Sequence, residues 1–150
     1  MGGMLHSRYP HQVCSVARAL EVIGERWSLL IVRDALQGMR RFEDFQRSLD
    51  IARNVLAARL DHLVAEGVLE RRPYGPSGHR QDYELTEKGR QLAVAVTALL
   101  NWGDRYYPDP GGPPRLVEHN DCGGPVVAAL VCSKDGQRLT GPELSMLPGP

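Results

Sequence analysis

Apolar positions recur at helical spacing over residues 14–66 and predict four short helices. Two are expected within 14–36, on either side of Gly24, and two more over 41–49 and 52–66. A short helix, a tight turn and a second helix with a leucine stripe are typical of a helix-turn-helix, although the pattern also fits a small helical bundle. The apolar positions that define the faces are Val16, Leu20, Ile23, Trp27, Leu30, Ile31, Ala35, Phe42, Phe45, Leu49, Leu56, Leu60, Leu63 and Val64.

The spacing changes from helical to alternating after Gly67. Residues 68–74 alternate apolar and charged side chains, residues 75–78 are dense in turn formers, and residues 80–85 form a second strand-like run. These features predict a β-hairpin, with Arg71, Arg72, His79 and Arg80 at its tip and flanks. The predicted fold is therefore a winged helix-turn-helix, mainly α with a small hairpin wing over 69–85.

A long amphipathic helix is predicted after the hairpin, over residues 87–107, with Thr86 as its N-cap. Its apolar stripe lies beyond the compact domain and needs a partner surface. We interpret the stripe as a dimerisation surface formed by Leu92, Val96, Leu99 and Leu100.

The prolines of 108–114 end this helix and divide the chain. We predict an N-terminal arm (1–13), a winged-helix domain that includes the dimerisation helix (14–107), a small zinc-ribbon-like β appendage (108–139) and a disordered tail (140–150).

The formal charge of the 150-residue chain is zero, so its overall electrostatics give no indication of nucleic-acid binding. Residues 1–80 carry twelve arginines, no lysine and nine acids, whereas residues 81–150 carry six basic and nine acidic residues. The arginine fork suits phosphate and guanine, which favours nucleic-acid contact in the first half. A genome-wide preference for arginine over lysine would explain the same bias.

The first twelve residues contain no apolar run typical of a signal peptide, and no stretch reaches the roughly 18 apolar residues of a membrane span. We therefore expect a cytoplasmic protein without a membrane partner. Three cysteines in such a chain argue against a disulfide framework and leave thiol and metal roles open.

Two short motifs in the appendage resemble the knuckles of a zinc ribbon. His119 and Cys122 precede one glycine, and Cys132 and Asp135 precede another. Zinc prefers cysteine and histidine ligands, and a carboxylate is less common in structural sites. The motifs predict either a zinc site formed by these four residues or a ribbon that has lost its metal.

The chain resembles the HxlR-type regulators, a winged-helix group related to the MarR regulators. The resemblance covers about residues 14–107 and lies in four ordered blocks: CSVARALEVIG (14–24) with RWSLLIVRD (26–34), RFEDF (41–45), LAARL (56–60) and YELTEKG (83–89). It implies a transcriptional regulator that binds a pseudo-palindromic operator in double-stranded DNA as a homodimer, pairing through its first and last helices. Where this family commonly has a serine cap on the recognition helix, the chain has Ala52, and we expect Asp50 to cap the helix instead.

On helix 52–66, helical geometry places Asn54, Ala58 and His62 opposite the leucine stripe. We predict that Asn54 contacts adenine and that Arg53 contacts phosphate or guanine. Arg59 would contact phosphate or pair with Glu43 or Asp44, while Asp61 and His62 are expected to be merely solvated. The predicted DNA-binding residues are Arg53, Asn54, Ala58, Arg59, Arg72, His79 and Arg80, with Arg71 also in the wing.

Cys14 begins the first predicted helix, a position where the helix dipole favours a reactive thiolate. Some proteins of the resembled family use a cysteine there to sense oxidants. We favour the alternative, that Cys14 is a small apolar contact at a dimer interface. The sequence therefore leaves open whether an oxidant or a small molecule regulates the protein.

Two alternatives to DNA binding remain. One is a redox sensor or enzyme that depends on thiols or zinc, and the other is a winged helix that binds another protein. The absence of a catalytic motif favours a non-enzyme.

Overall fold

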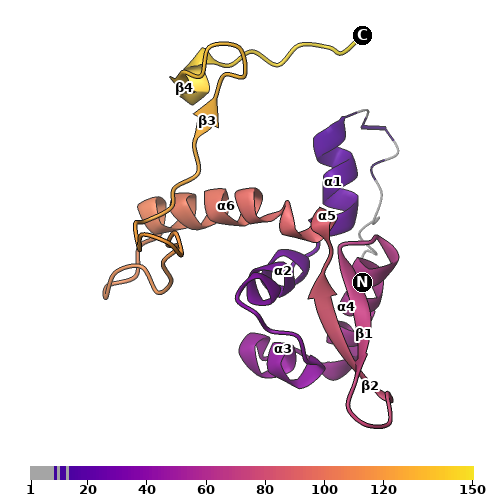
Figure 1. The fold of residues 1–150 in the computed structure, drawn as a ribbon. Coiled ribbons are helices and arrows are strands. Elements are labelled where there is room, and N and C mark those ends of the chain that lie inside the picture. The colour runs from indigo at the N-terminus through magenta and orange to yellow at the C-terminus, as the bar shows by residue number, and fades with distance from the viewer. Residues whose placement is uncertain (1–8, 10, 13) are drawn as a thin grey trace, which may run out of the picture. The chain divides into compact units, whose positions relative to one another are not determined.

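The computed structural model describes residues 9, 11, 12 and 14–150, which divide into two compact units, Met1–Ala93 and Val94–Pro150 (Figure 1). The predicted N-terminal arm (1–13) lies mostly outside the described residues. The predicted domain 14–107 spans parts of both units, and the two units are described separately below.

Four helices open the first unit, as the sequence predicts: α1 (Ser15–Ile23), α2 (Ser28–Leu36), α3 (Phe42–Leu49) and α4 (Arg53–Ala65). The core consists of apolar side chains from α2, α3, α4 and the start of the hairpin, together with Ala17 of α1. Phe45, Leu56, Leu60 and Leu63 are fully buried, so the predicted stripes on α3 and α4 are confirmed.

The wing is an antiparallel hairpin of β1 (Leu69–Tyr74) and β2 (Arg80–Leu85), in which Leu69 pairs with Leu85 and Tyr74 with Arg80. Gly75 and Gly78 turn the chain with φ of +83° and +64°, which side chains with a Cβ rarely adopt. Figure 1 shows the hairpin running beside α4. On the other edge of β2, the Tyr83 amide donates to the Arg40 carbonyl at 2.7 Å, which ties the wing to the segment between α2 and α3.

The predicted cap of the recognition helix was wrong. Asp50 ends α3 in a left-handed conformation (φ 48°, ψ 47°), and Ala52 is the N-cap residue of α4. Because Asp50 is needed to turn the chain between the two helices, its carboxylate is not positioned at the start of α4. The helix also begins one residue later than expected, at Arg53.

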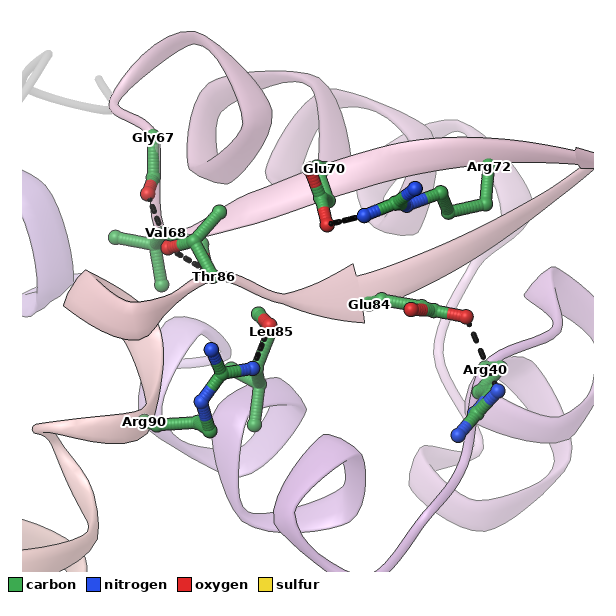
Figure 2. Close-up of polar contacts among 9 residues, drawn as sticks. All are labelled: Arg40, Gly67, Val68, Glu70, Arg72, Glu84, Leu85, Thr86 and Arg90. Atoms are coloured by element: carbon green, nitrogen blue, oxygen red, sulfur yellow. Dashed lines mark hydrogen bonds and ion pairs between the residues drawn. The ribbon is translucent and has the colours of Figure 1, made fainter.

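Thr86 caps α5 (Glu87–Arg90), as predicted, but the long helix is interrupted. Its hydroxyl accepts a hydrogen bond from the Gly89 amide at 3.1 Å. The same hydroxyl donates to the Gly67 carbonyl at 2.6 Å (Figure 2). After α5, the Leu92 amide bonds to the Gly89 carbonyl, a tighter i→i+3 turn, and α6 begins at Ala93. The prediction of one continuous helix over 87–107 was therefore wrong.

Replacing Thr86 with alanine removes the N-cap hydrogen bond of α5 and the hydrogen bond from its hydroxyl to the Gly67 carbonyl, which follows α4. We expect a loss of about 1–2 kcal/mol in the free energy of unfolding, measured by urea denaturation. Thr86→Ser keeps the hydroxyl and is the matched control, so equal losses in the two variants would show that the hydroxyl does not stabilise the fold.

The second unit contains α6 (Ala93–Tyr106), β3 (Leu130–Val131), β4 (Arg138–Leu139) and a 3-10 turn at Gly141–Glu143 within the segment predicted to be disordered. The Asn101 side chain accepts the Ala128 amide at 2.8 Å and so connects α6 to the appendage. No residue of 94–150, all of which are described, is buried. Among the described residues, no helix is both long and apolar enough to cross a membrane.

Candidate nucleic-acid interface

One face of α4 is exposed along its length. Asn54, Ala58 and Asp61, spaced i, i+4 and i+7, are all exposed, and Arg53 lies beside them in the first turn. The Asn54 amide has no hydrogen-bond partner among the described residues, so its donors and acceptor are available to a ligand. The Arg53 guanidinium lies over the Phe42 ring, 4.6 Å from its centroid, which connects it to α3.

The structure places Arg59 and His62 differently from what the sequence predicts. Arg59 pairs with Glu25 (Nε to Oε2, 3.2 Å), not with Glu43 or Asp44. His62 is half-buried, with Nε2 3.1 Å from the Val22 carbonyl oxygen, and does not face outward as expected. Both side chains connect α4 to the region of α1 and α2, contacts between distant segments that helical spacing alone does not reveal.

Asp61 was interpreted as a solvated residue, but it joins the recognition-type helix to the wing. Its carboxylate accepts from Nη2 of Arg71, which lies on β1. The hydrogen bond between Arg71 and the Tyr83 side chain, followed by attraction to Asp61, raises the pKa of Arg71 above its usual range. The i+7 spacing shows in the sequence that Asp61 shares a helix face with Asn54, but it does not show the contact with Arg71.

The other wing cations differ in how they are held. Arg72 donates to Glu70 at 2.6 Å, and this ion pair raises the pKa of Arg72 (Figure 2). His79 and Arg80 are exposed and make no ion pair within the described residues. Arg80 is therefore the wing arginine whose charge is not already partnered, and the exposed His79 imidazole lies next to it in the sequence.

A cleft of about 220 Å³ lies between the end of α2, β2 and α5. Leu36, Met39 and Tyr83 line it together with Arg40 and Arg90. Arg40 already pairs with Glu84 at 3.0 Å, and Arg90 donates to the Leu85 carbonyl at 2.7 Å (Figure 2). The cleft is smaller than the roughly 300–1,000 Å³ typical of ligand pockets, and its cations are engaged by the protein.

The two knuckles of the appendage share one backbone geometry. The Gly123 amide bonds to the His119 carbonyl and the Gly136 amide to the Cys132 carbonyl, and both glycines have positive φ. The side chains pair within each knuckle. Nδ1 of His119 lies 3.3 Å from Sγ of Cys122. A hydrogen bond from the Gln137 amide, followed by one from the Cys132 thiol, lowers the pKa of Asp135.

The predicted zinc ligands do not form a set that fits a metal ion. Among the described residues, no three histidine, cysteine, aspartate or glutamate side chains lie close enough to hold one. Structural zinc requires four ligands in tetrahedral arrangement, whereas His119 pairs with Cys122 and Cys132 with Asp135. The appendage therefore has the backbone of two knuckles without an assembled metal centre.

Cys14 is the N-cap residue of α1, as expected from its position in the sequence, and it is exposed. Val16 and Leu20, which follow it on α1, are also exposed (64% and 41%). The apolar face predicted for this helix therefore exists but is not covered within the described chain.

A sequence model described as HxlR-like helix-turn-helix matches residues 22–110, more than half of the chain and the whole region of α2 to the wing. The chain belongs to the HxlR family. Its HxlR domain thus contains the exposed face of α4 and the hairpin described above, and the winged helix-turn-helix prediction is confirmed.

Proteins similar to this chain are named as transcriptional regulators or transcription factors. The HTH-type transcriptional regulator Rv3095 of Mycobacterium tuberculosis is 45% identical over 136 residues, which cover 91% of this chain and 86% of Rv3095. The crystal structure of PA1607, a candidate transcription factor, is 42% identical with a TM-score of 0.82 and covers 93% of this chain and 97% of that one. This HxlR-family protein is a transcriptional regulator of the helix-turn-helix type.

One similar structure is a redox regulator, HypR in its reduced form. It is 31% identical to this chain with a TM-score of 0.57, and the match covers 62% of this chain and 95% of HypR.

Proposed function

We propose that this HxlR-family protein binds a pseudo-palindromic operator as a homodimer and thereby regulates transcription. The observation that carries the proposal is the exposed face of α4, on which Asn54 presents an unpartnered amide next to Arg53. The family, the fold and the names of the relatives support a DNA partner.

In this proposal, α4 enters the major groove with its N-terminal turn nearest the bases. Asn54 makes a bidentate contact with adenine, Arg53 reaches phosphate or guanine, and Ala58 lies against the base edges. His79, Arg80 and Arg72 of the wing contact the backbone or the minor groove, and Arg59 supports α4 through Glu25. The N-cap residue Ala52 has no side-chain oxygen, which leaves amides of the first turn free to bind a phosphate.

A gel-shift titration with DNA from upstream of the protein's own gene, together with a scrambled duplex of equal composition, tests this proposal. We expect a salt-sensitive shift of the upstream duplex at protein concentrations that leave the scrambled duplex free. If the operator does not lie upstream of this gene, a duplex that the protein selects from a randomised pool replaces the upstream duplex as the matched probe.

The homodimer is supported by the exposed apolar side chains of α6. Leu99, Trp102 and Tyr106, spaced i, i+3 and i+7, are each more than half exposed. Leu92, Val96 and Leu100, the other predicted dimerisation residues, are half-buried. A unit of 57 residues in which nothing is buried needs further apolar contact to be stable, and a second copy would supply it.

Replacing Leu99 with glutamate places a charge on this surface. We expect the dissociation constant of the dimer, measured by sedimentation equilibrium, to rise by roughly a hundredfold. This corresponds to a loss of about 3 kcal/mol in the free energy of association. Leu116→Glu changes another exposed leucine, 70% accessible and outside the helix, and should leave association unchanged. Equal association of wild type and Leu99→Glu would contradict the assignment of this surface.

An oxidant-responsive role is a second candidate function, which we propose from the exposure of Cys14 at the start of α1 and the similarity to HypR. In this scheme, the Cys14 thiol attacks hydrogen peroxide, the O–O bond breaks, and sulfenic acid and water are produced. The thiol sulfur is oxidised and the peroxide is reduced.

Treatment with hydrogen peroxide is then expected to change DNA affinity in the wild type and not in Cys14→Ser. Cys122→Ser, which replaces another exposed thiol, should respond like the wild type. A peroxide response that persists in Cys14→Ser would exclude Cys14 as the sensor.

A further inference from the structure

The exposed face of α4 carries a negative charge in its C-terminal half. Asp61 lies seven residues after Asn54 and three after Ala58, which places it on the same side of the helix and about 10 Å further along the axis. Its side chain is 65% exposed. A carboxylate on a DNA-facing surface repels phosphates, so its presence there requires a reason.

Asp61 binds an arginine of the wing. Nη2 of Arg71 donates to the Asp61 carboxylate, and the Arg71 guanidinium lies 5.9 Å from the centroid of the Tyr83 ring. Two side chains therefore hold the Arg71 guanidinium: the Asp61 carboxylate and the Tyr83 ring. In this arrangement Arg71 is turned toward α4 and its charge is neutralised.

This neutralisation matters because few cations in the region are free. Arg59 pairs with Glu25 and Arg72 with Glu70. Near α4 and the wing, this leaves Arg53, Arg80 and Arg41, which lies over the Tyr74 ring, without an ion pair within the described residues. Non-specific DNA affinity depends on how many phosphates the protein neutralises, whereas selectivity depends on base contacts. An arginine that is held away from phosphate therefore lowers the affinity for non-specific DNA.

We propose that Asp61 is a specificity-determining residue: it withholds Arg71 from the DNA backbone and thereby weakens binding to non-matching DNA more than binding to the operator. The effect is unequal because base contacts fix the register on the operator, while a released Arg71 could reach a phosphate in any register on other DNA. This inference rests on the proposed function and names a residue that sets its selectivity.

The test compares Asp61→Asn with the wild type on two probes, a duplex selected by the wild type from a randomised pool and a scrambled duplex of the same composition. We expect the slope of log affinity against log salt on the scrambled duplex to steepen by about 0.9, as for one additional phosphate contact. Affinity for the scrambled duplex should rise several-fold and the ratio between the two probes should fall.

Two further variants test whether the change in slope comes from the release of Arg71 or from the loss of a negative charge on α4. The double variant D61N/R71Q should return to the wild-type slope because the released cation is gone. Glu66→Gln removes an equal charge from the end of the same helix, about 120° around the axis from Asn54, and should leave both slope and ratio unchanged.

Three results would overturn the inference: an unchanged slope in Asp61→Asn, an equal change in Glu66→Gln, or weaker binding of Asp61→Asn to the selected duplex alone, which would make Asp61 a direct reader of a base. A wild-type protein that binds both probes equally would instead overturn the proposed function. The slope on the scrambled duplex would still decide whether Asp61 withholds Arg71.

Discussion

Replacing Asn54 with alanine is expected to abolish most of the sequence selectivity of DNA binding. A bidentate amide contact with a base contributes about 1–3 kcal/mol to discrimination. Because a homodimer carries two copies of α4, this discrimination energy is lost twice, roughly 2–6 kcal/mol in total. The ratio of the affinity for matched DNA to that for scrambled DNA should therefore fall at least about thirtyfold. Binding titrations with both duplexes at one salt concentration measure this ratio.

The variant should leave folding and non-specific binding intact, because Asn54 is exposed and makes no hydrogen bond within the described residues. Asn120→Ala makes the same substitution at an exposed position in the appendage and is the matched control. If both variants retain the wild-type ratio, Asn54 does not read a base.

Replacing Gly89 with alanine is expected to destabilise the fold, although helix propensity alone predicts the opposite. Gly89 lies within α5, where alanine would ordinarily stabilise by about 0.5–1 kcal/mol. A Cβ at this position would stand 2.2 Å from the Val68 carbonyl oxygen and 2.8 Å from Cδ2 of Leu85. Val68 is buried and its carbonyl also accepts the Thr86 amide, so the backbone has little freedom to move away. Steric overlap of this kind typically costs about 1–3 kcal/mol.

Gly103→Ala provides the matched control, since Gly103 is also helical and an added Cβ there meets nothing within 4 Å. Urea denaturation should show a lower free energy of unfolding for Gly89→Ala and an equal or slightly higher one for Gly103→Ala. Stabilisation by both substitutions would show that the close approach of α5 to Val68 is absent in solution.

The parts of the fold that the sequence predicts correctly depend on local periodicity. Phe45 and Leu60 fall on stripes spaced at the helical period, and both are fully buried. The glycines at 75 and 78 marked the wing turn because the backbone there requires positive φ. Spacing of this kind is a property of one segment, so it can be read without knowing what the segment contacts.

The incorrect predictions concern contacts between segments. Asp50 matched the chemistry of a cap, but the turn between α3 and α4 needed it in a left-handed conformation. Arg59 had acids nearby in the sequence and paired with the more distant Glu25. Asp61 was treated as solvated because its partner, Arg71, comes from a strand that only folding brings beside α4.

We propose above that side chains on the exposed face of α4 contact specific bases of the operator. The most direct measurement is the affinity of the wild-type protein for its selected duplex and for a scrambled duplex over a range of salt concentrations. We expect the affinity for the selected duplex to exceed that for the scrambled duplex by a factor on the order of 10³ or more, and both affinities to fall as salt increases. Equal affinities for the two duplexes at every salt concentration would contradict it.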